Sequence, residues 1–169
     1  MALILIRHPE TEQNQAKVFP DYTDAPYTKT GLNQLHAVLQ PDFSVKHIYS
    51  SPLGRALRMA EKLGEKYDLE VVIDERLREI DLGHFAGLTY QEIERYYPDM
   101  ITDWMADPWH FKYPAGESYP DLKHRVLEFM KHVSTDSIIC THQAVSQVIA
   151  AEFGDEEPLE TGEWRVYED

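Results

Sequence analysis

The sequence is poor in cysteine, in basic residues and in long apolar runs. Its one cysteine, Cys140, leaves no possibility of an intrachain disulfide, which suits a reducing compartment. Lysine and arginine number 16 against 30 aspartate and glutamate residues, and the formal net charge is −14. A field of this sign repels nucleic-acid phosphates and anionic membranes, so we expect no nucleic-acid partner and no membrane partner. The apolar runs are too short for a membrane span or a secretion signal.

The remaining composition is that of an ordinary soluble domain. The chain has 169 residues, of which 43% are hydrophobic and 27% charged, and this length buries a substantial core. We therefore expect a single domain over residues 1–169, located in the cytoplasm; the composition leaves the oligomeric state open. A small anion remains an acceptable ligand, because local arginines override the net field at short range.

Short apolar runs alternate with helical patterns along the chain. Buried strands are expected at 3–6, 45–49, 69–73 and 137–141, and an edge strand at 164–167. The spacing of apolar residues predicts helices at 32–39, 53–63, 89–97, 118–133 and 144–153, and a short one within 11–17. Residues 18–28 are expected to form a loop, and 99–113 a loop holding a short helix. This alternation predicts an α/β fold.

Charged and polar side chains follow three of these strands. Arg7 and His8 come directly after 3–6, and His142 comes directly after 137–141. Because parallel strands end at one edge of a sheet, where ligands bind, the two histidines are expected to face each other. Arg55 falls in the first turn of the helix after the second strand, a position that favours an anion. A lone histidine is more often structural, and a lone arginine more often forms a surface ion pair.

Several short segments occur in a fixed order around these residues. They are Arg7-His8-Pro9-Glu10-Thr11 to Asn14, Asp24-Ala25-Pro26-Tyr27-Thr28 to Gly31, Ser51-Pro52-Leu53-Gly54-Arg55-Ala56, Leu77-Arg78-Glu79 to Gly83, Gly116-Glu117-Ser118, and His142. In these segments the chain resembles the histidine phosphatase superfamily, which includes the phosphoglycerate mutases. The resemblance implies a three-layer α/β/α sandwich with a mostly parallel central sheet, and a phosphatase that acts on a small phosphorylated metabolite without a metal or other cofactor.

The resemblance also implies a role for each matching residue. His8 would attack phosphorus and carry the phosphoryl group, while Arg7, Arg55 and His142 would surround the phosphoryl oxygens. Glu79 would protonate the leaving alkoxide, with Glu75 and Asp81 as rivals for this role. Residues implied in substrate binding are Asn14, Thr23 and Gln143.

Departures from the family pattern bear on substrate choice. Pro9 replaces the usual glycine and removes one backbone N–H. Ala86 stands at a common glutamate, and Gln143-Ala144 replace a glycine pair.

The segment between Glu79, the implied proton donor, and Gly116 bears on the choice between a phosphatase and a mutase. It is shorter than in the mutases and holds only two basic residues, Arg95 and Lys112, which favours hydrolysis over transfer. Its aromatic residues are expected either to cover the organic part of a substrate or to pack as ordinary core: Trp104, Trp109, Phe111 and Tyr113. The open alternatives are a mutase, and a catalytically silent relative that binds a phosphorylated ligand or a protein.

Overall fold

A mixed sheet organises the computed structural model, which describes residues 2–168. Its strands lie in the order β3-β2-β4-β1-β5, with bounds Val71–Ile73, His47–Ser50, Ser137–Thr141, Ala2–Arg7 and Trp164–Glu168. The first four of these run parallel, and β5 pairs antiparallel with β1. All five residues of β4 are buried, because this strand lies in the middle of the sheet. Its unbroken apolar pattern is therefore the one expected of a parallel strand covered on both faces.

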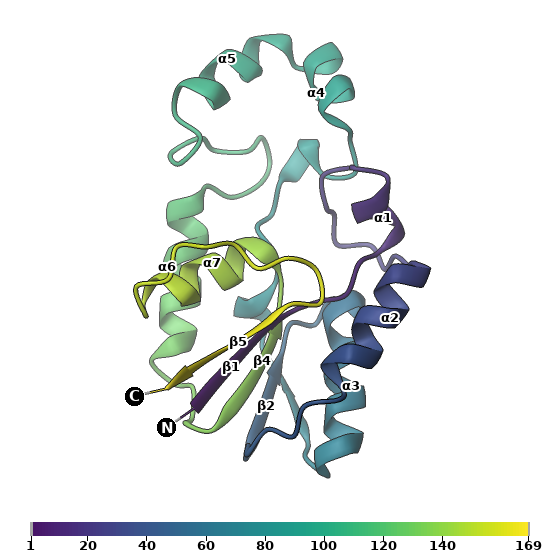
Figure 1. Ribbon diagram of the computed structural model, residues 1–169. Coiled ribbons are helices and arrows are strands. Elements are labelled where there is room, and N and C mark those ends of the chain that lie inside the picture. Colours follow the sequence, from purple (N-terminus) through teal and green to yellow (C-terminus); the bar gives the residue numbers. More distant parts are fainter. Residues whose placement is uncertain (1, 169) are drawn as a thin grey trace.

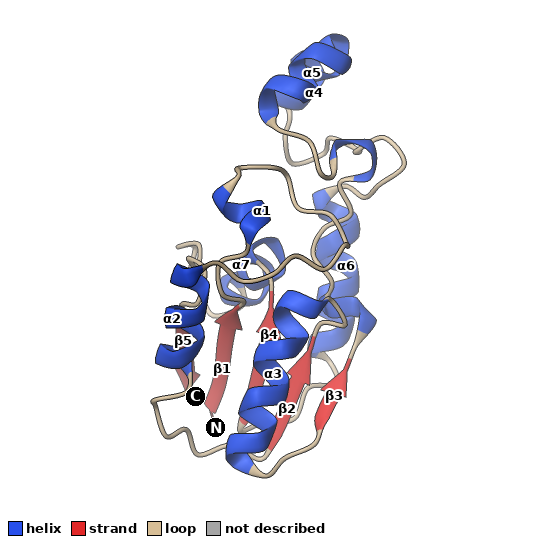
Figure 2. Ribbon diagram, turned by 90° about the vertical axis from the view of Figure 1, so that its right-hand side faces the viewer, coloured by secondary structure: helices blue, strands red, loops and turns tan. Residues whose placement is uncertain are grey.

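Helices cover both faces of this sheet (Figures 1 and 2). On one face α2 and α3 pack over Ile4, Ile48 and Ile138; on the other, α6 and α7 pack over Leu5 and Ile139. The α-helices are α1 Glu12–Gln15, α2 Lys29–Val38, α3 Gly54–Tyr67, α4 Tyr90–Tyr96, α5 Pro98–Ala106, α6 Tyr119–Met130 and α7 Gln143–Ala151; two 3-10 turns are η1 Glu75–Leu77 and η2 Gly83–Phe85. The expected three-layer α/β/α sandwich with a mostly parallel sheet is confirmed.

Some bounds differ from those expected from the sequence. The strand expected at 69–73 is shortened to β3, Val71–Ile73, at the edge of the sheet, where Val72 and Ile73 are exposed. Residues 99–113 are less irregular than expected, because α5 occupies Pro98–Ala106. Pro98 follows α4 as a stop, but it also opens α5, since proline is well tolerated in a first helical turn.

The α4–α5 segment projects above the carboxyl edge of the sheet (Figure 1). An aromatic ring of α5 packs on the body of the molecule: the centroid of the Trp104 ring lies 5.5 Å from that of Phe85 and 5.6 Å from that of Phe19. Such pairs add specific contact energy to the area they bury. Within residues 2–168, no helix is both long and apolar enough to cross a membrane.

Candidate active site

The two histidines meet at the carboxyl edge of the sheet. Strands β1 and β4 are paired so that Arg7 lies opposite Thr141, and the next residue of each strand is a histidine. The His8 N–H continues the ladder by donating to the Thr141 carbonyl at 3.0 Å. As a result the rings of His8 and His142 lie with centroids 5.2 Å apart. The parallel register of two apolar runs is what brings these side chains together.

The His8 imidazole is held in one tautomer. Its Nδ1 lies 2.7 Å from the Pro9 carbonyl oxygen, which can only accept, so Nδ1 carries the proton and Nε2 keeps its lone pair. The ring is buried, and burial followed by the charge of Arg55 lowers the pKa of His8 to about 3. The imidazole is therefore neutral at physiological pH. Pro9 supplies the orienting acceptor through its carbonyl, a group that the exchange of glycine for proline leaves intact.

Three buried groups around His8 have polar atoms without partners. Arg7 donates from Nη1 to the Leu159 carbonyl at 2.8 Å, and Arg55 donates from Nη1 to the Asp21 carbonyl at 2.9 Å. Within residues 2–168, Arg7 Nε, Arg55 Nη2 and His142 Nδ1 are buried and have no hydrogen-bond partner. Unsatisfied buried donors are costly and rare in folded proteins, so their gathering beside one imidazole indicates an anion site.

Ser51 orients the second histidine. Its Oγ lies 2.7 Å from His142 Nε2 and accepts a hydrogen bond from the Leu53 N–H at 3.2 Å. When the serine hydroxyl donates to Nε2, the proton of neutral His142 lies on Nδ1. Burial lowers the pKa of His142 well below its usual value, with Arg55 adding to the effect. His142 is therefore neutral, and in this tautomer its Nδ1–H is a donor.

Among the three candidate carboxyls, Glu79 is the buried one. It is 6% exposed, and its Oε1 and Oε2 accept from the N–H groups of Ile80 (2.9 Å) and Ala144 (3.4 Å). Burial raises the pKa of Glu79, although these hydrogen bonds and two nearby arginines oppose the shift. The rivals have other partners: Glu75 pairs with Arg78 at the surface, and Asp81 accepts from the Gly83 N–H. Glu79 thus has the environment of a proton donor.

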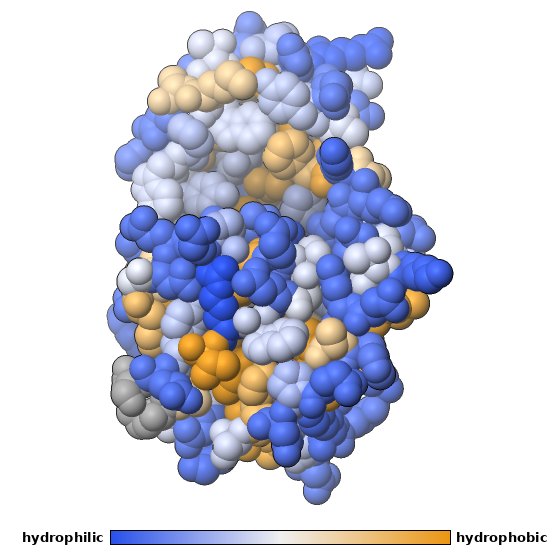
Figure 3. All heavy atoms as spheres, in the orientation of Figure 1, coloured by the Kyte–Doolittle hydropathy of each residue, from blue (hydrophilic) through white to orange (hydrophobic). Residues whose placement is uncertain are grey.

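Two connected cavities open above these residues. The first, of about 350 Å³, is lined by Arg7, His8 and Glu79 together with Asn14 and Gln143. The second, of about 270 Å³, shares Phe19, Pro20, Glu79 and Gln143 with the first and continues beneath Trp104, Tyr113 and Tyr119. Figure 3 shows a hollow below the α4–α5 segment, in which white and orange residues gather among blue ones. Glu79 lies where the polar and the aromatic cavity join.

Of the three implied substrate-binding residues, two line a cavity and one does not. Asn14 and Gln143 both line the first cavity. The Asn14 carbonyl oxygen accepts from the Thr11 N–H in a capping box, so its amide NH₂ is the part that can donate to a ligand. Thr23 is exposed and lies apart from the lining residues of both cavities; its N–H donates to Asp21 Oδ1 at 2.9 Å in a local turn.

The structure adds residues to which the sequence assigned no role. Glu160 and Thr161, on the loop before β5, line the first cavity. Ser51 opens the Ser51–Ala56 segment that resembles the family, so its place in the site could have been predicted from the sequence. No sequence motif marks Arg125, although its side chain donates a hydrogen bond to the Glu79 carbonyl. Within residues 2–168, the histidine, cysteine and acidic side chains form no cluster of three or more that could hold a metal ion.

Comparison with known proteins places the chain in a family. The model of the histidine phosphatase superfamily (branch 1) matches residues 3–168. The chain belongs to the histidine phosphatase superfamily. It is 33% identical over 134 residues to phosphoserine phosphatase 1 of Hydrogenobacter thermophilus, covering 78% of this chain and 63% of that protein. It is 34% identical over 138 residues to probable phosphoglycerate mutase GpmB of Serratia proteamaculans, covering 78% and 62%.

Among solved structures, the fold of this chain is similar to that of alpha-ribazole phosphatase from Shigella flexneri. The TM-score is 0.86 at 24% identity, covering 98% of this chain and 89% of that one. The matched regions are less than two thirds of the length of the two sequence relatives. Family and fold are thus shown.

Proposed function

We propose that this protein is a metal-independent phosphomonoester hydrolase that works through a phosphohistidine at His8. One observation carries the proposal: a neutral imidazole with a free Nε2 lies beside three buried, unpartnered polar groups, on Arg7, Arg55 and His142. Two guanidinium groups and one neutral N–H suit a phosphoryl group, because arginine pairs with two oxygens at once and stays charged. Such preorganised donors stabilise the charge that spreads over the equatorial oxygens in the transition state.

The reaction has two steps. His8 Nε2 forms a bond to phosphorus while the bond from phosphorus to the ester oxygen breaks, and the Glu79 carboxyl gives its proton to the departing alkoxide. Water then attacks the phosphohistidine, Glu79 takes a proton from it, and the N–P bond breaks to return the electron pair to Nε2. The products are the alcohol and inorganic phosphate. The raised pKa of Glu79 and the lowered pKa of His8 suit these starting protonation states.

The second cavity supports a proposal for the organic part of the substrate. His8 and Arg7 line only the first cavity, whereas Glu79 lines both. A phosphoryl group on His8 would therefore direct its ester oxygen past Glu79 and its organic group toward Trp104 and Tyr113. Because these walls are aromatic, we propose an alcohol with an apolar or aromatic surface as the leaving group.

Hydrolysis is favoured over mutase chemistry by the position of the basic residues in the α4–α5 region. Arg95 lies over the Tyr96 ring, and Lys112 donates to Asp121 at 2.8 Å; neither lines the two cavities among the described residues. A mutase needs such charges to hold a sugar-acid carboxylate. A silent relative is disfavoured because the full set of reacting side chains is assembled. The single cysteine supports a cytoplasmic location as part of the same proposal.

The test is phosphate release from a panel of esters in the presence of a chelator. Phosphoserine, 3-phosphoglycerate, 2-phenylethyl phosphate and 4-nitrophenyl phosphate would be compared with wild type, His8→Ala and the exposed-site control His124→Ala. We expect release by wild type and by the control, with His8→Ala inactive. Absence of release from every ester between pH 4 and 8 would contradict the proposal, as would loss of activity on chelation. Transfer to an acceptor alcohol in place of release would point to the mutase.

A further inference from the structure

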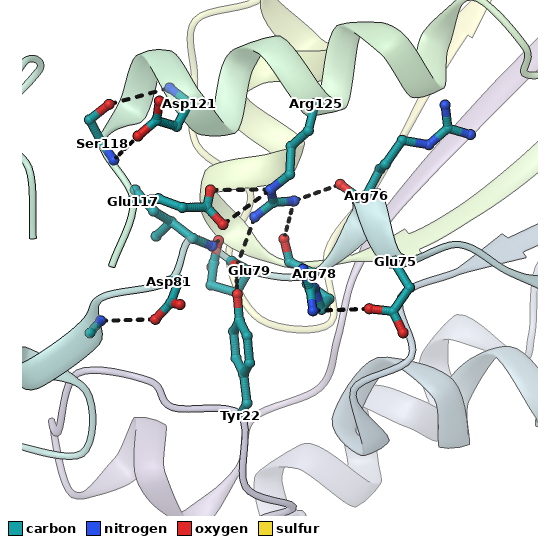
Figure 4. Close-up of polar contacts among 12 residues, drawn as sticks. Tyr22, Glu75, Arg76, Arg78, Glu79, Asp81, Glu117, Ser118, Asp121 and Arg125 are labelled. Carbon is teal, nitrogen blue, oxygen red and sulfur yellow. Dashed lines mark hydrogen bonds and ion pairs between the residues drawn. The ribbon is translucent and has the colours of Figure 1, made fainter. Parts of the chain in front are cut away.

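The peptide carbonyl of Glu79 is held by two side chains from distant parts of the chain. The Tyr22 hydroxyl donates to this oxygen at 2.8 Å, and Arg125 donates to it from Nη2 at 3.1 Å. Figure 4 shows both side chains reaching the Glu79 backbone from opposite sides, Arg125 from α6 and Tyr22 from the loop between α1 and α2. Both lone pairs of the carbonyl are thereby occupied, and the peptide group is fixed from two directions.

That peptide group also holds the Glu79 carboxyl. The carbonyl of residue 79 and the N–H of Ile80 belong to one planar unit, and the Ile80 N–H donates to Glu79 Oε1 at 2.9 Å. Fixing the oxygen of a rigid plane fixes the direction of its N–H. Donors on the oxygen also polarise the unit and strengthen its N–H as a donor. One peptide plane thus links the hydrogen bonds from Tyr22 and Arg125 to the hydrogen bond that holds the Glu79 carboxyl group.

Arg125 is committed to this backbone segment and does not face solvent. Its side chain is 16% exposed, and Nη1 donates to the carbonyls of Arg76 and Arg78 at 2.6 and 2.8 Å. Its Nε pairs with Glu117 at 3.1 Å, so the glutamate of the Gly-Glu-Ser segment orients the guanidinium (Figure 4). The planar fork of arginine can satisfy several acceptors at once, which the single ammonium of lysine cannot do in the same geometry.

Tyr22 joins the acid loop to the phosphate clamp. The preceding residue, Asp21, accepts from Arg55 Nη1 through its backbone carbonyl at 2.9 Å. Two consecutive residues of one loop thus contact different parts of the site: Asp21 contacts Arg55 on α3, and Tyr22 contacts the Glu79 peptide group. Burial raises the pKa of Tyr22 to about 12, so its hydroxyl remains a donor over the working pH range.

We propose that Tyr22 and Arg125 are positioning residues that set the direction of the Glu79 carboxyl relative to the phosphate clamp. The inference rests on the proposed function for its kinetic consequence, but the contact between the Ile80 N–H and the carboxyl exists without substrate. Loss of either anchor loosens that contact and makes the carboxylate less stable. The carboxyl then points less accurately at the leaving oxygen, and proton donation slows.

Other charged and titratable groups act on the same carboxyl and must be held constant. Arg55 on α3 and Arg7 on β1 favour its ionised form. Tyr119 of α6 is coupled to it, and the neutral rings of His8 and His142 lie at the adjoining strand ends. Tyr22→Phe alters none of these groups. Arg125→Lys keeps the positive charge and removes the planar guanidinium group.

The experiment compares wild type, Tyr22→Phe and Arg125→Lys with Tyr49→Phe as the matched control. The Tyr49 hydroxyl also joins two distant parts of the chain, donating to Ser134 Oγ at 3.2 Å and accepting from the Ser134 N–H at 3.3 Å, but Ser134 lies before the amino end of β4. The first readout is kcat/KM, which reports the steps up to departure of the leaving group, for 2-phenylethyl phosphate and for 4-nitrophenyl phosphate, whose leaving group needs little protonation. The second is ¹³C NMR titration of the Glu79 carboxyl in the free protein. Thermal unfolding identifies any variant that does not fold.

In both site variants we expect about a fivefold loss of kcat/KM on the alkyl ester, the scale of one hydrogen bond, and less than a twofold loss on the aryl ester. The Glu79 titration should move to higher pH, and the control should match wild type. Equal losses on both esters, or an unmoved titration in folded Tyr22→Phe, would overturn the inference. If wild type hydrolysed neither ester, the proposed function would fail, and the titration alone would decide the positioning role.

Discussion

Acid should destabilise this protein through the buried imidazole of His8. The ring is 3% exposed, and burial together with Arg55 lowers its pKa from 6.5 to about 3. Below pH 6.5 the unfolded chain therefore binds a proton at this position that the folded chain does not bind. The free energy of unfolding must fall as the pH falls from 6.5 toward 3, because protons favour the state that binds more of them.

The size of the effect follows from the two pKa values. Each pH unit below the unfolded-state pKa lowers the free energy of unfolding by about 1.4 kcal/mol. This histidine therefore lowers the free energy of unfolding by about 2 kcal/mol between pH 7 and pH 5. His142 and the carboxyls add their own pH dependence, which cancels when wild type is compared with a His8 variant. His8→Asn suits the comparison, because asparagine keeps an N–H donor near the position of Nδ1, where the Pro9 carbonyl accepts.

Urea unfolding of wild type and His8→Asn at pH 7, 6 and 5 gives this difference directly. We expect the stability of wild type relative to His8→Asn to fall by about 2 kcal/mol between pH 7 and pH 5. His124→Asn, at an exposed position, serves as the control. If the difference between wild type and His8→Asn stayed constant over this range, the His8 pKa would not be depressed. The ring would then be protonated at pH 5, and a neutral nucleophile would lose its physical basis.

Three further results are expected. Glu79→Gln should lower kcat/KM, which reports the steps up to departure of the leaving group, about 100-fold or more for alkyl phosphates and less than tenfold for 4-nitrophenyl phosphate, as general-acid catalysis requires; equal losses of kcat/KM would argue against Glu79 as the acid. Ser51→Ala should lower the free energy of unfolding by about 1–3 kcal/mol in urea melts, because His142 Nε2 loses its partner in a buried site; unchanged stability would show that the Ser51–His142 bond is dispensable. Trp104→Ala should raise KM for 2-phenylethyl phosphate more than for phosphoserine, and a uniform change would speak against the aromatic cavity as the site for the organic group.

The sequence predicts that the two histidines meet, for a physical reason. Two apolar runs that form neighbouring parallel strands must end at one edge, so His8 and His142 meet wherever the chain forms this sheet. Arg55 follows from the same logic, since it opens the helix after β2. The choice of Glu79 over Asp81 and Glu75 came only from resemblance to a family. Burial separates the three carboxyls, and burial is decided by packing that a local pattern does not contain.

Other features depend on contacts that leave no mark in the sequence. Arg125 and Glu79 are separated by 46 positions, and their link is to a backbone carbonyl, which every residue has. The direction of Thr23 depends on a turn closed by Asp21, so the order of residues in that loop does not show which side chains face the cavity. The contact of Pro9 with the site is likewise visible only in three dimensions, because the group that meets His8 Nδ1 is a backbone carbonyl, which proline shares with glycine.

The most direct measurement is to trap the phosphoryl group on the protein. Wild type and Glu79→Gln would be mixed with 4-nitrophenyl phosphate, quenched in base within milliseconds to seconds, digested, and mapped by mass spectrometry under conditions that preserve phosphohistidine. We expect a single phosphorylated residue, His8, which accumulates more in Glu79→Gln because the hydrolysis of the intermediate is slowed. A phosphoryl group found on another residue, or product release with no phosphorylated protein at any time point in either form, would contradict His8 as the nucleophile.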